Sequence, residues 1–216
     1  QAWTNGSRST YAYTAFGKVQ TLVFDFWEDD HWTPYQQTNY NYDSNQFPDG
    51  EFRQIWDAGT ATWVEDSVTM QTCDDNGNLI WSQFEQWVGD ALQPMQRVTQ
   101  TFSPSNQMLT SVTENYDNTD WKNESKTTYA YDANDYMVFS LFQNWADETN
   151  SWQDFFHHNY TNNPDGTISE FVSQQWLNPW TNFQRALYTY DNLGIAENES
   201  GSFAFYPNPT TDALHL

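Results

Sequence analysis

One feature constrains this chain more than any other: two aromatic anchors recur together about every thirty residues. The first anchor is the second aromatic position of a short pair such as Tyr11-Ala-Tyr13, and it falls at positions 13, 42, 73, 102, 131, 160 and 190. The second anchor falls at Trp27, Trp56, Trp87, Tyr116, Trp145 and Trp176. Two independent anchors that keep one period indicate tandem repeats. Each unit is then one supersecondary element that packs against its neighbours.

Each unit contains two strand-like segments and two turns. Turn residues that end in glycine follow the aromatic pair, at Phe47-Pro-Asp-Gly50, Asp74-Asp-Asn-Gly77, Asn163-Pro-Asp-Gly166 and Asp191-Asn-Leu-Gly194. Asp at the start bonds backbone N–H groups, and Gly takes the positive φ that closes a hairpin. A second, polar turn separates the second anchor from a third aromatic residue, found at Trp32, Trp63, Trp121, Trp152 and Trp180. In the third unit Leu92-Gln-Pro94 takes its place.

The segment between the turns alternates in the manner of a strand. Counting back by twos from Trp145 gives Gln143, Leu141, Phe139 and Met137, which predicts one face, while Phe142 points to the other. We therefore expect an all-β fold: tandem antiparallel hairpins of about 30 residues that form an elongated or spiralling sheet of about thirteen strands. A closed barrel or a sandwich is the alternative.

Composition limits the partners. The chain has 29 Asp and Glu against 7 Lys and Arg, a formal net charge of −22. That balance argues against nucleic acid and anionic membrane surfaces, because no cationic surface can neutralise phosphates. Aromatic residues make up 19% of the chain, which argues against disorder. No run of 18 apolar residues predicts a transmembrane segment, and the single cysteine, Cys73, excludes an internal disulfide.

No catalytic constellation stands out, so we expect no enzyme activity. Four aspartates recur at the same position of the repeat and are interpreted as turn formers: Asp43, Asp74, Asp132 and Asp191. Cys73 occupies a repeat position that otherwise holds Tyr or Phe. His158, in the only local histidine pair, likewise occupies a repeat tyrosine position. No cofactor is predicted. Asp74-Asp-Asn-Gly-Asn78 offers closely spaced oxygens to a Ca²⁺ ion but lacks the distal Glu of an EF-hand loop.

The tryptophans are the best binding candidates, because indole rings stack on the apolar faces of sugars while Gln and Asn bond the hydroxyls. The second-anchor tryptophans are expected to pack the array. The hairpin-tip set is the predicted glycan site, with core packing as its alternative: Trp32, Trp63, Trp121, Trp152 and Trp180.

The C-terminal residues differ from the repeat. Tyr206-Pro207-Asn208-Pro209 lies between the apolar pairs Phe203/Phe205 and Leu214/Leu216. This stretch resembles the start of the C-terminal sorting domain that Bacteroidota proteins carry for type IX secretion. Asp66-Ser67-Val68 resembles the short O-glycosylation sequon of the same bacteria. The repeat stops at about Tyr190-Asp191, which gives a repeat domain at 1–191 and a polar linker at 192–202. The likeness implies a truncated sorting domain at 203–216, and the Gln1 start fits a trimmed mature protein.

The repeat unit itself resembles the tyrosine-aspartate repeats of Rhs and teneurin proteins. Tyr129-Ala-Tyr-Asp132 and Tyr188-Thr-Tyr-Asp191 carry the likeness, whereas the longer unit and the added tryptophans depart from that family. The resemblance implies a spiral built from hairpins with no catalytic activity of its own.

These observations predict a secreted or cell-surface, non-enzymatic repeat protein: an adhesin, scaffold or assembly component at the outer-membrane surface or outside the cell. Its expected partners are the type IX secretion machinery, other surface proteins, and further copies added through sheet edges. The alternative is a carbohydrate-binding protein that uses exposed hairpin-tip tryptophans.

Overall fold

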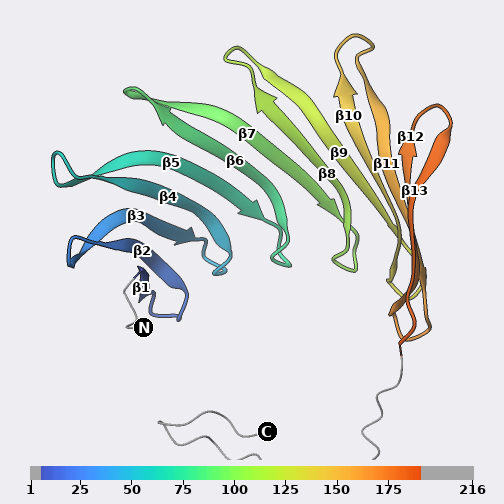
Figure 1. The fold of residues 1–216 in the computed structure, drawn as a ribbon, viewed down its shortest axis with the longest axis horizontal. Helices are drawn as coiled ribbons and strands as arrows, with labels where there is room; N and C mark the ends of the chain where they lie inside the picture. The colour runs from blue at the N-terminus through green and yellow to red at the C-terminus, as the bar shows by residue number, and fades with distance from the viewer. Residues whose placement is uncertain (1–5, 191–216) are drawn as a thin grey trace, which may run out of the picture.

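The chain folds into a single antiparallel sheet, seen in a computed structural model that describes residues 6–190. Thirteen strands follow one another in chain order (Figure 1). They are β1 (Ser7–Tyr13), β2 (Val19–Glu28), β3 (His31–Tyr42), β4 (Pro48–Asp57), β5 (Thr62–Cys73), β6 (Leu79–Val88), β7 (Ala91–Phe102), β8 (Met108–Tyr116), β9 (Trp121–Tyr131), β10 (Met137–Ala146), β11 (Ser151–Asn162), β12 (Ile168–Trp176) and β13 (Trp180–Leu187). Nothing between residues 6 and 190 forms a helix that could cross a membrane.

The sheet is an open arc, so the predicted hairpin array is confirmed and the barrel and sandwich alternatives are wrong (Figure 1). One set of turns, such as β4–β5 and β8–β9, lies on the outer rim of the arc. The other set, such as β3–β4 and β7–β8, lies on the inner rim. Strands β1 and β13 are the two edges, and each pairs with one neighbour in the described part of the chain.

The inner turns repeat one geometry. In each, the fourth residue donates its N–H to the carbonyl of the first and takes a positive φ, as Gln46 does to Asp43 and Gly77 to Asp74. Phe47–Gly50 was predicted as the second unit's turn, and that is wrong. Asp43 accepts the N–H groups of Asn45 and Phe47, which closes the turn before Pro48, and Gly50 lies inside β4.

Every pair of neighbouring strands contains one β-bulge, seen as a register step in which one residue has no partner. The unpaired residues of the even-numbered strands are Gln20, Asp49, Ile80, Leu109, Val138 and Ser169. Those of the odd-numbered strands are Tyr35, Asp66, Met95, Glu124, Phe155 and Phe183. Because a bulge bends its strand and increases the local twist, this regular set gives the sheet its curvature.

The bulges also decide which residues share a face. We call the face that bears Trp145 and Trp152 the tryptophan face, and the opposite one the tyrosine face after Tyr129. The unpaired Val138 breaks the predicted alternation, so Met137 lies opposite Tyr131 and lines a pocket with Tyr129 and Phe142. The prediction that Met137 shares a face with Trp145 is therefore wrong, whereas the opposite placement of Phe142 is confirmed.

The sheet is one layer thick, so it has no apolar core in the usual sense. No apolar side chain is fully buried among residues 6–190. The buried side chains are small and polar, namely Asp25, Thr38, Ser67, Ser140 and Ser173. Stability must come from cross-strand pairs and nearest-neighbour contacts, as expected of a repeat array.

The last strand of the described residues, β13, ends at Leu187, and the repeat domain at 1–191 stays a prediction. The predicted linker (192–202), the predicted sorting domain (203–216) and its motif Tyr206, Pro207, Asn208 and Pro209 lie outside the residues that the structure describes.

Candidate binding surface on the tryptophan face

Aromatic pairs follow the outer rim of the arc, at the ends of five of its six hairpins. In each pair a tip tryptophan lies directly across the strand from the second anchor of its own hairpin, as Trp63 does from Trp56. The pairs are Trp27–Trp32, Trp56–Trp63, Tyr116–Trp121, Trp145–Trp152 and Trp176–Trp180, with ring centroids 5.0–5.4 Å apart and edge-to-face planes. In the third hairpin Trp87 lies opposite Leu92. Such pairs add roughly 0.5–1.5 kcal/mol beyond burial.

The tip tryptophans predicted as a glycan site all lie in this row and are all half-buried: Trp32, Trp63, Trp121, Trp152 and Trp180. Their side chains are therefore neither freely exposed, as a glycan site would have them, nor fully buried, as core packing would have them. Each tip tryptophan packs against an anchor in a cross-strand pair, so both sets contribute to packing, and glycan binding by the tips stays a prediction. Of the anchors, Trp176 is exposed and the other tryptophans are half-buried.

Below the aromatic row, three repeats place a cationic or imidazole side chain against the tip tryptophan of the next hairpin. Arg8 donates two hydrogen bonds to Oδ2 of the buried Asp25, and its guanidinium lies 4.7 Å from the Trp32 ring centroid. Arg97 donates one hydrogen bond to each carboxylate oxygen of Glu114, and its guanidinium lies 4.6 Å from the Trp121 ring centroid. This ion pair raises the pKa of Arg97.

His157 holds the equivalent place in the last hairpin. Its ring hydrogen-bonds Gln174 and lies 4.1 Å from the Trp180 ring centroid. In the second and fifth hairpins the equivalent residues are Gln37 and Lys126, which lie opposite Gln54 and Gln143. The tip tryptophans of the first, fourth and sixth hairpins are therefore each covered by a cationic or imidazole group.

Polar side chains form a second row next to the aromatic pairs. Gln143 donates to Asp154 at 2.8 Å, and Gln174 donates to Asn182 at 2.7 Å. Gln54 and Glu65 occupy the same positions in the second hairpin. The tryptophan face thus combines indole rings with amides and carboxylates, the side-chain chemistry that binds sugar hydroxyls.

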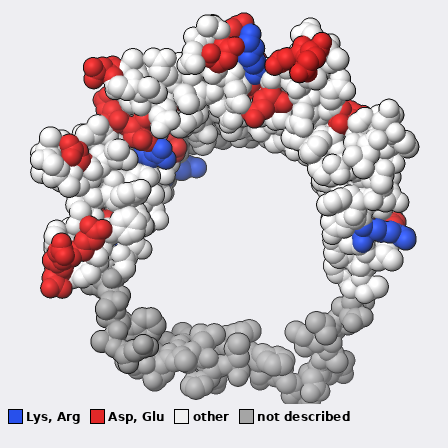
Figure 2. Space-filling model, turned by 45° about the horizontal axis from the view of Figure 1, so that its top comes forward, with Lys and Arg blue, Asp and Glu red and all other residues white. Residues whose placement is uncertain are grey.

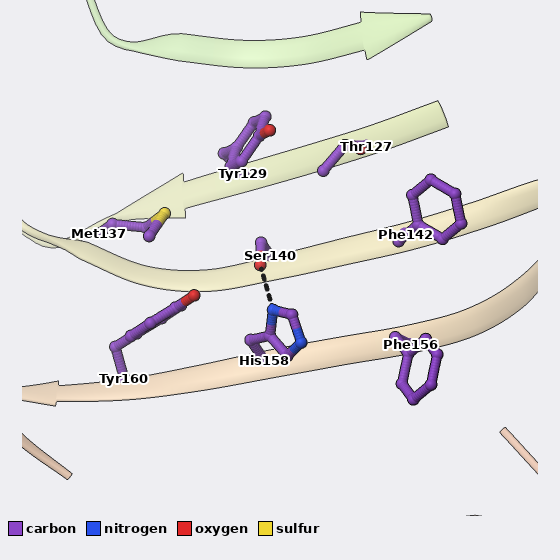
Figure 3. A pocket seen from close by; sticks show the side chains of 8 residues that line it. All are labelled: Thr127, Tyr129, Met137, Ser140, Phe142, Phe156, His158 and Tyr160. Carbon is purple, nitrogen blue, oxygen red and sulfur yellow. Dashed lines mark hydrogen bonds between the residues drawn. The ribbon is translucent and has the colours of Figure 1, made fainter. Parts of the chain in front are cut away.

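The tyrosine face contains a separate pocket of about 390 Å³, drawn in Figure 3. Tyr129, Phe142, Phe156 and Tyr160 supply most of its lining, and Ser140 lies 3.4 Å from His158 Nδ1 at its base. Burial, together with the nearby His157, lowers the pKa of His158. His158 thus sits among the aromatic residues, as its repeat position predicts.

The aspartates at the inner turns act as turn formers in the structure. Both carboxylate oxygens of Asp74 accept hydrogen bonds, from the backbone of Asn76 and Asn78 and from the Asn78 amide. Those bonds lower the Asp74 pKa. Asp43 and Asp132 bond their turns in the same way. Asp191 lies outside the described residues.

Calcium binding at Asp74–Asn78 stays a prediction. Among residues 6–190, no group of three or more His, Cys, Asp or Glu side chains is arranged to hold a metal ion.

Two other sequence features take structural roles. Cys73 lies 3.7 Å from the Pro48 carbonyl, and burial, followed by the nearby Asp43 and Asp74, raises its thiol pKa.

Ser67, the acceptor of the predicted O-glycosylation sequon, is 4% exposed and donates a hydrogen bond to Asp66. The folded sheet does not present Ser67 to a modifying enzyme, so the sequon reading conflicts with the structure.

Comparisons with known proteins give no assignment. No protein-family model matches the chain, and no curated protein matches it. A DUF3836 family protein from Bacteroides vulgatus is 13% identical over 42% of this chain and 91% of its own, with a TM-score of 0.36. A protein of unknown function from Bacteroides fragilis is 13% identical over 75% and 95%, with a TM-score of 0.35. A porin-like protein from Bacteroides uniformis is 11% identical over 82% and 86%, also at 0.35. At these TM-scores none of them contributes to the functional argument.

Proposed function

We propose that this chain is a secreted or cell-surface, non-enzymatic repeat protein that acts as an adhesin, scaffold or assembly component. The observation that carries the proposal is the single-layer sheet. In the described residues no second layer covers either face, and β1 and β13 each leave one edge free to add a strand. A surface of this shape suits contact with partners along its whole length.

The acidic charge supports a role outside the cell. Figure 2 shows acidic side chains along the outside of the arc, with few basic ones between them. A net charge of −22 keeps separate molecules soluble through mutual repulsion. Tyr206-Pro207-Asn208-Pro209, through its resemblance to the type IX sorting domain, supports export to the outer-membrane surface or beyond.

Fractionation of the native host tests the proposed location and export route. We expect the full-length protein on the cell surface or in the medium, where added protease digests it on intact cells. In a strain that lacks a core component of the type IX machinery, it should accumulate inside the outer membrane. Unchanged surface delivery in that strain would contradict the proposed route.

Carbohydrate binding is the second candidate function. The observation that favours it is the row of half-buried indole rings, with a parallel row of amides and carboxylates on the same face. Sugars present an apolar face to the ring and hydroxyls to such polar groups.

A glycan array tests this candidate with one matched pair of variants. Trp152→Ala removes an indole from the row, and we expect its binding to fall about two- to tenfold, since one stacking contact is worth about 0.5–1.5 kcal/mol. Phe183→Ala, an exposed ring at a bulge of β13, is the control and should bind as the parent does. Tip tryptophans that a soluble quencher does not reach, together with no array binding, would leave the scaffold role alone.

A further inference from the structure

The outer rim opens into a groove between the β8–β9 and β10–β11 hairpins. Its volume is about 550 Å³, and it is lined by Asp117, Trp121, Lys122, Asn123, Trp145, Asp147 and Asn150. The pairing of β9 with β10 ends at Ser125 and Asn144, so the two hairpin tips separate beyond that point. The groove is thus a consequence of the fan-like spread of the strands toward the rim (Figure 1).

The two aromatic rings that line the groove are held in place from the sides. Trp121 packs against Tyr116 with centroids 5.4 Å apart and carries the Arg97 guanidinium at 4.6 Å. Trp145 packs against Trp152 at 5.0 Å. Because these contacts fix both rings before any ligand arrives, binding there loses little side-chain entropy.

Polar groups that line the groove keep unused hydrogen-bonding capacity. In the described part of the chain, the side chains of Asn123, Asp147 and Asn150 make no hydrogen bond to another residue, although each lines the groove. Asp117 differs, because its Oδ1 accepts bonds from Thr119 and the Asp120 backbone, which lower its pKa to about 2. Two amides and one carboxylate therefore remain to bond hydroxyl groups.

The charge of the groove selects among sugars. Asp117 and Asp147 stand against a single cation, Lys122, whose Nζ already lies 3.8 Å from Asp117. A uronate or sulfate group would meet net negative charge, and like-charge contacts oppose binding.

We propose that this groove is a subsite for a neutral, pyranose-containing glycan, with Trp121 and Trp145 against the sugar faces and Asn123, Asp147 and Asn150 bonded to its hydroxyls. The proposal rests on the carbohydrate-binding candidate above and names the site and the class of sugar. It adds Trp145, Asn123, Asp147 and Asn150 to the predicted tip set.

Affinity electrophoresis of the full chain tests the proposal. The gels contain neutral polymers (laminarin, yeast mannan or dextran) or the acidic polymer polygalacturonate. We expect retardation by at least one neutral polymer and none by polygalacturonate. In the double variant Asn123→Ala/Asn150→Ala, apparent affinity for that neutral polymer should fall about fivefold to a hundredfold, because each lost hydrogen bond costs about two- to tenfold.

A matched pair of aromatic variants separates the groove from general loss of packing. Trp145→Ala and Phe26→Ala each break an edge-to-face pair whose centroids lie 5.0 Å apart, but Phe26 lies on the tyrosine face, outside both the groove and the aromatic row. Trp145→Ala should abolish retardation and Phe26→Ala should keep it.

Three results would overturn the proposal, and they differ in reach. If no neutral polymer retards the parent chain, the carbohydrate-binding candidate fails with the subsite. If the parent is retarded but the double asparagine variant migrates identically to it, the subsite fails while carbohydrate binding stands. Equal retardation by polygalacturonate would overturn the selectivity for neutral sugars.

Discussion

Gly50→Ala is expected to destabilise the sheet by about 3 kcal/mol, since a strained backbone and a steric overlap act together at this residue. Gly50 is buried in β4, next to the bulge at Asp49, with a φ of +153°. A Cβ atom there would overlap the carbonyl oxygen of Thr69 on β5 and meet the Met70 Cα at 3.4 Å. Backbone atoms of a paired strand cannot move aside as a flexible side chain would.

Gly89→Ala provides the control for this prediction. Gly89 also has a positive φ, +64°, but nothing lies within 4 Å of the position that its Cβ would take. Only the left-handed backbone is strained there, at a cost of about 1 kcal/mol. Urea denaturation followed by tryptophan fluorescence measures both variants. Equal losses of stability would contradict the overlap with Thr69 as the cause.

Arg97→Ala is expected to lower the stability of the array by about 2 kcal/mol, because Glu114 then loses its charged hydrogen-bond partner while half-buried. Arg97 bonds both Glu114 oxygens, at 2.5 and 2.7 Å, and packs on Trp121. The variant also uncovers one face of Trp121, so tryptophan fluorescence should become easier to quench. Urea denaturation and acrylamide quenching provide the two measurements.

Two further variants define the origin of that effect. Arg97→Lys keeps the charge but not the paired hydrogen bonds, so it should recover about half of the lost stability. Arg185→Ala removes an ion pair whose arginine side chain is 64% exposed, and its cost should stay below about 1 kcal/mol. If Arg97→Ala is no less stable than Arg185→Ala, the lower solvent exposure of the Arg97–Glu114 ion pair does not account for its contribution to stability.

Much of the architecture could be predicted from the spacing of aromatic residues. Because a hairpin repeat pairs only with its neighbours, a period near thirty residues with two turns dictates about thirteen strands, and residues 6–190 form thirteen. The turn roles of Asp43, Asp74 and Asp132 followed from local chemistry, since an aspartate bonds N–H groups within four residues of itself.

The bulges could not be predicted, and most errors trace to them. A single unpaired residue such as Val138 reverses the side-chain alternation without leaving a mark in residue type, so Met137 was placed on the wrong face. The role of Gly50 was missed for the same reason: a glycine after Pro-Asp is typical of a turn, but Gly50 belongs to a bulged strand.

The candidate site was predicted only in part. The tip tryptophans were identified as residues, but sequence does not reveal that each faces its own anchor across the hairpin. The groove residues Asp117 and Asp147 lie 30 positions apart, so the repeat period alone would have placed them on adjacent tips. Asn123 and Asn150 are 27 positions apart, outside the spacing of the anchors, so the period gave no signal for them.

The amino-acid sequence by itself determined the repeat unit, the strand count, the acidic character and the location of the aromatic pairs. These properties depend on local turn chemistry and on residue type, which need no knowledge of distant contacts. Tertiary structure alone decided the arc, the faces of the sheet, the covered and open indoles, and the groove between Trp121 and Trp145. These depend on register, and register is a property of strand pairs that one unpaired residue changes.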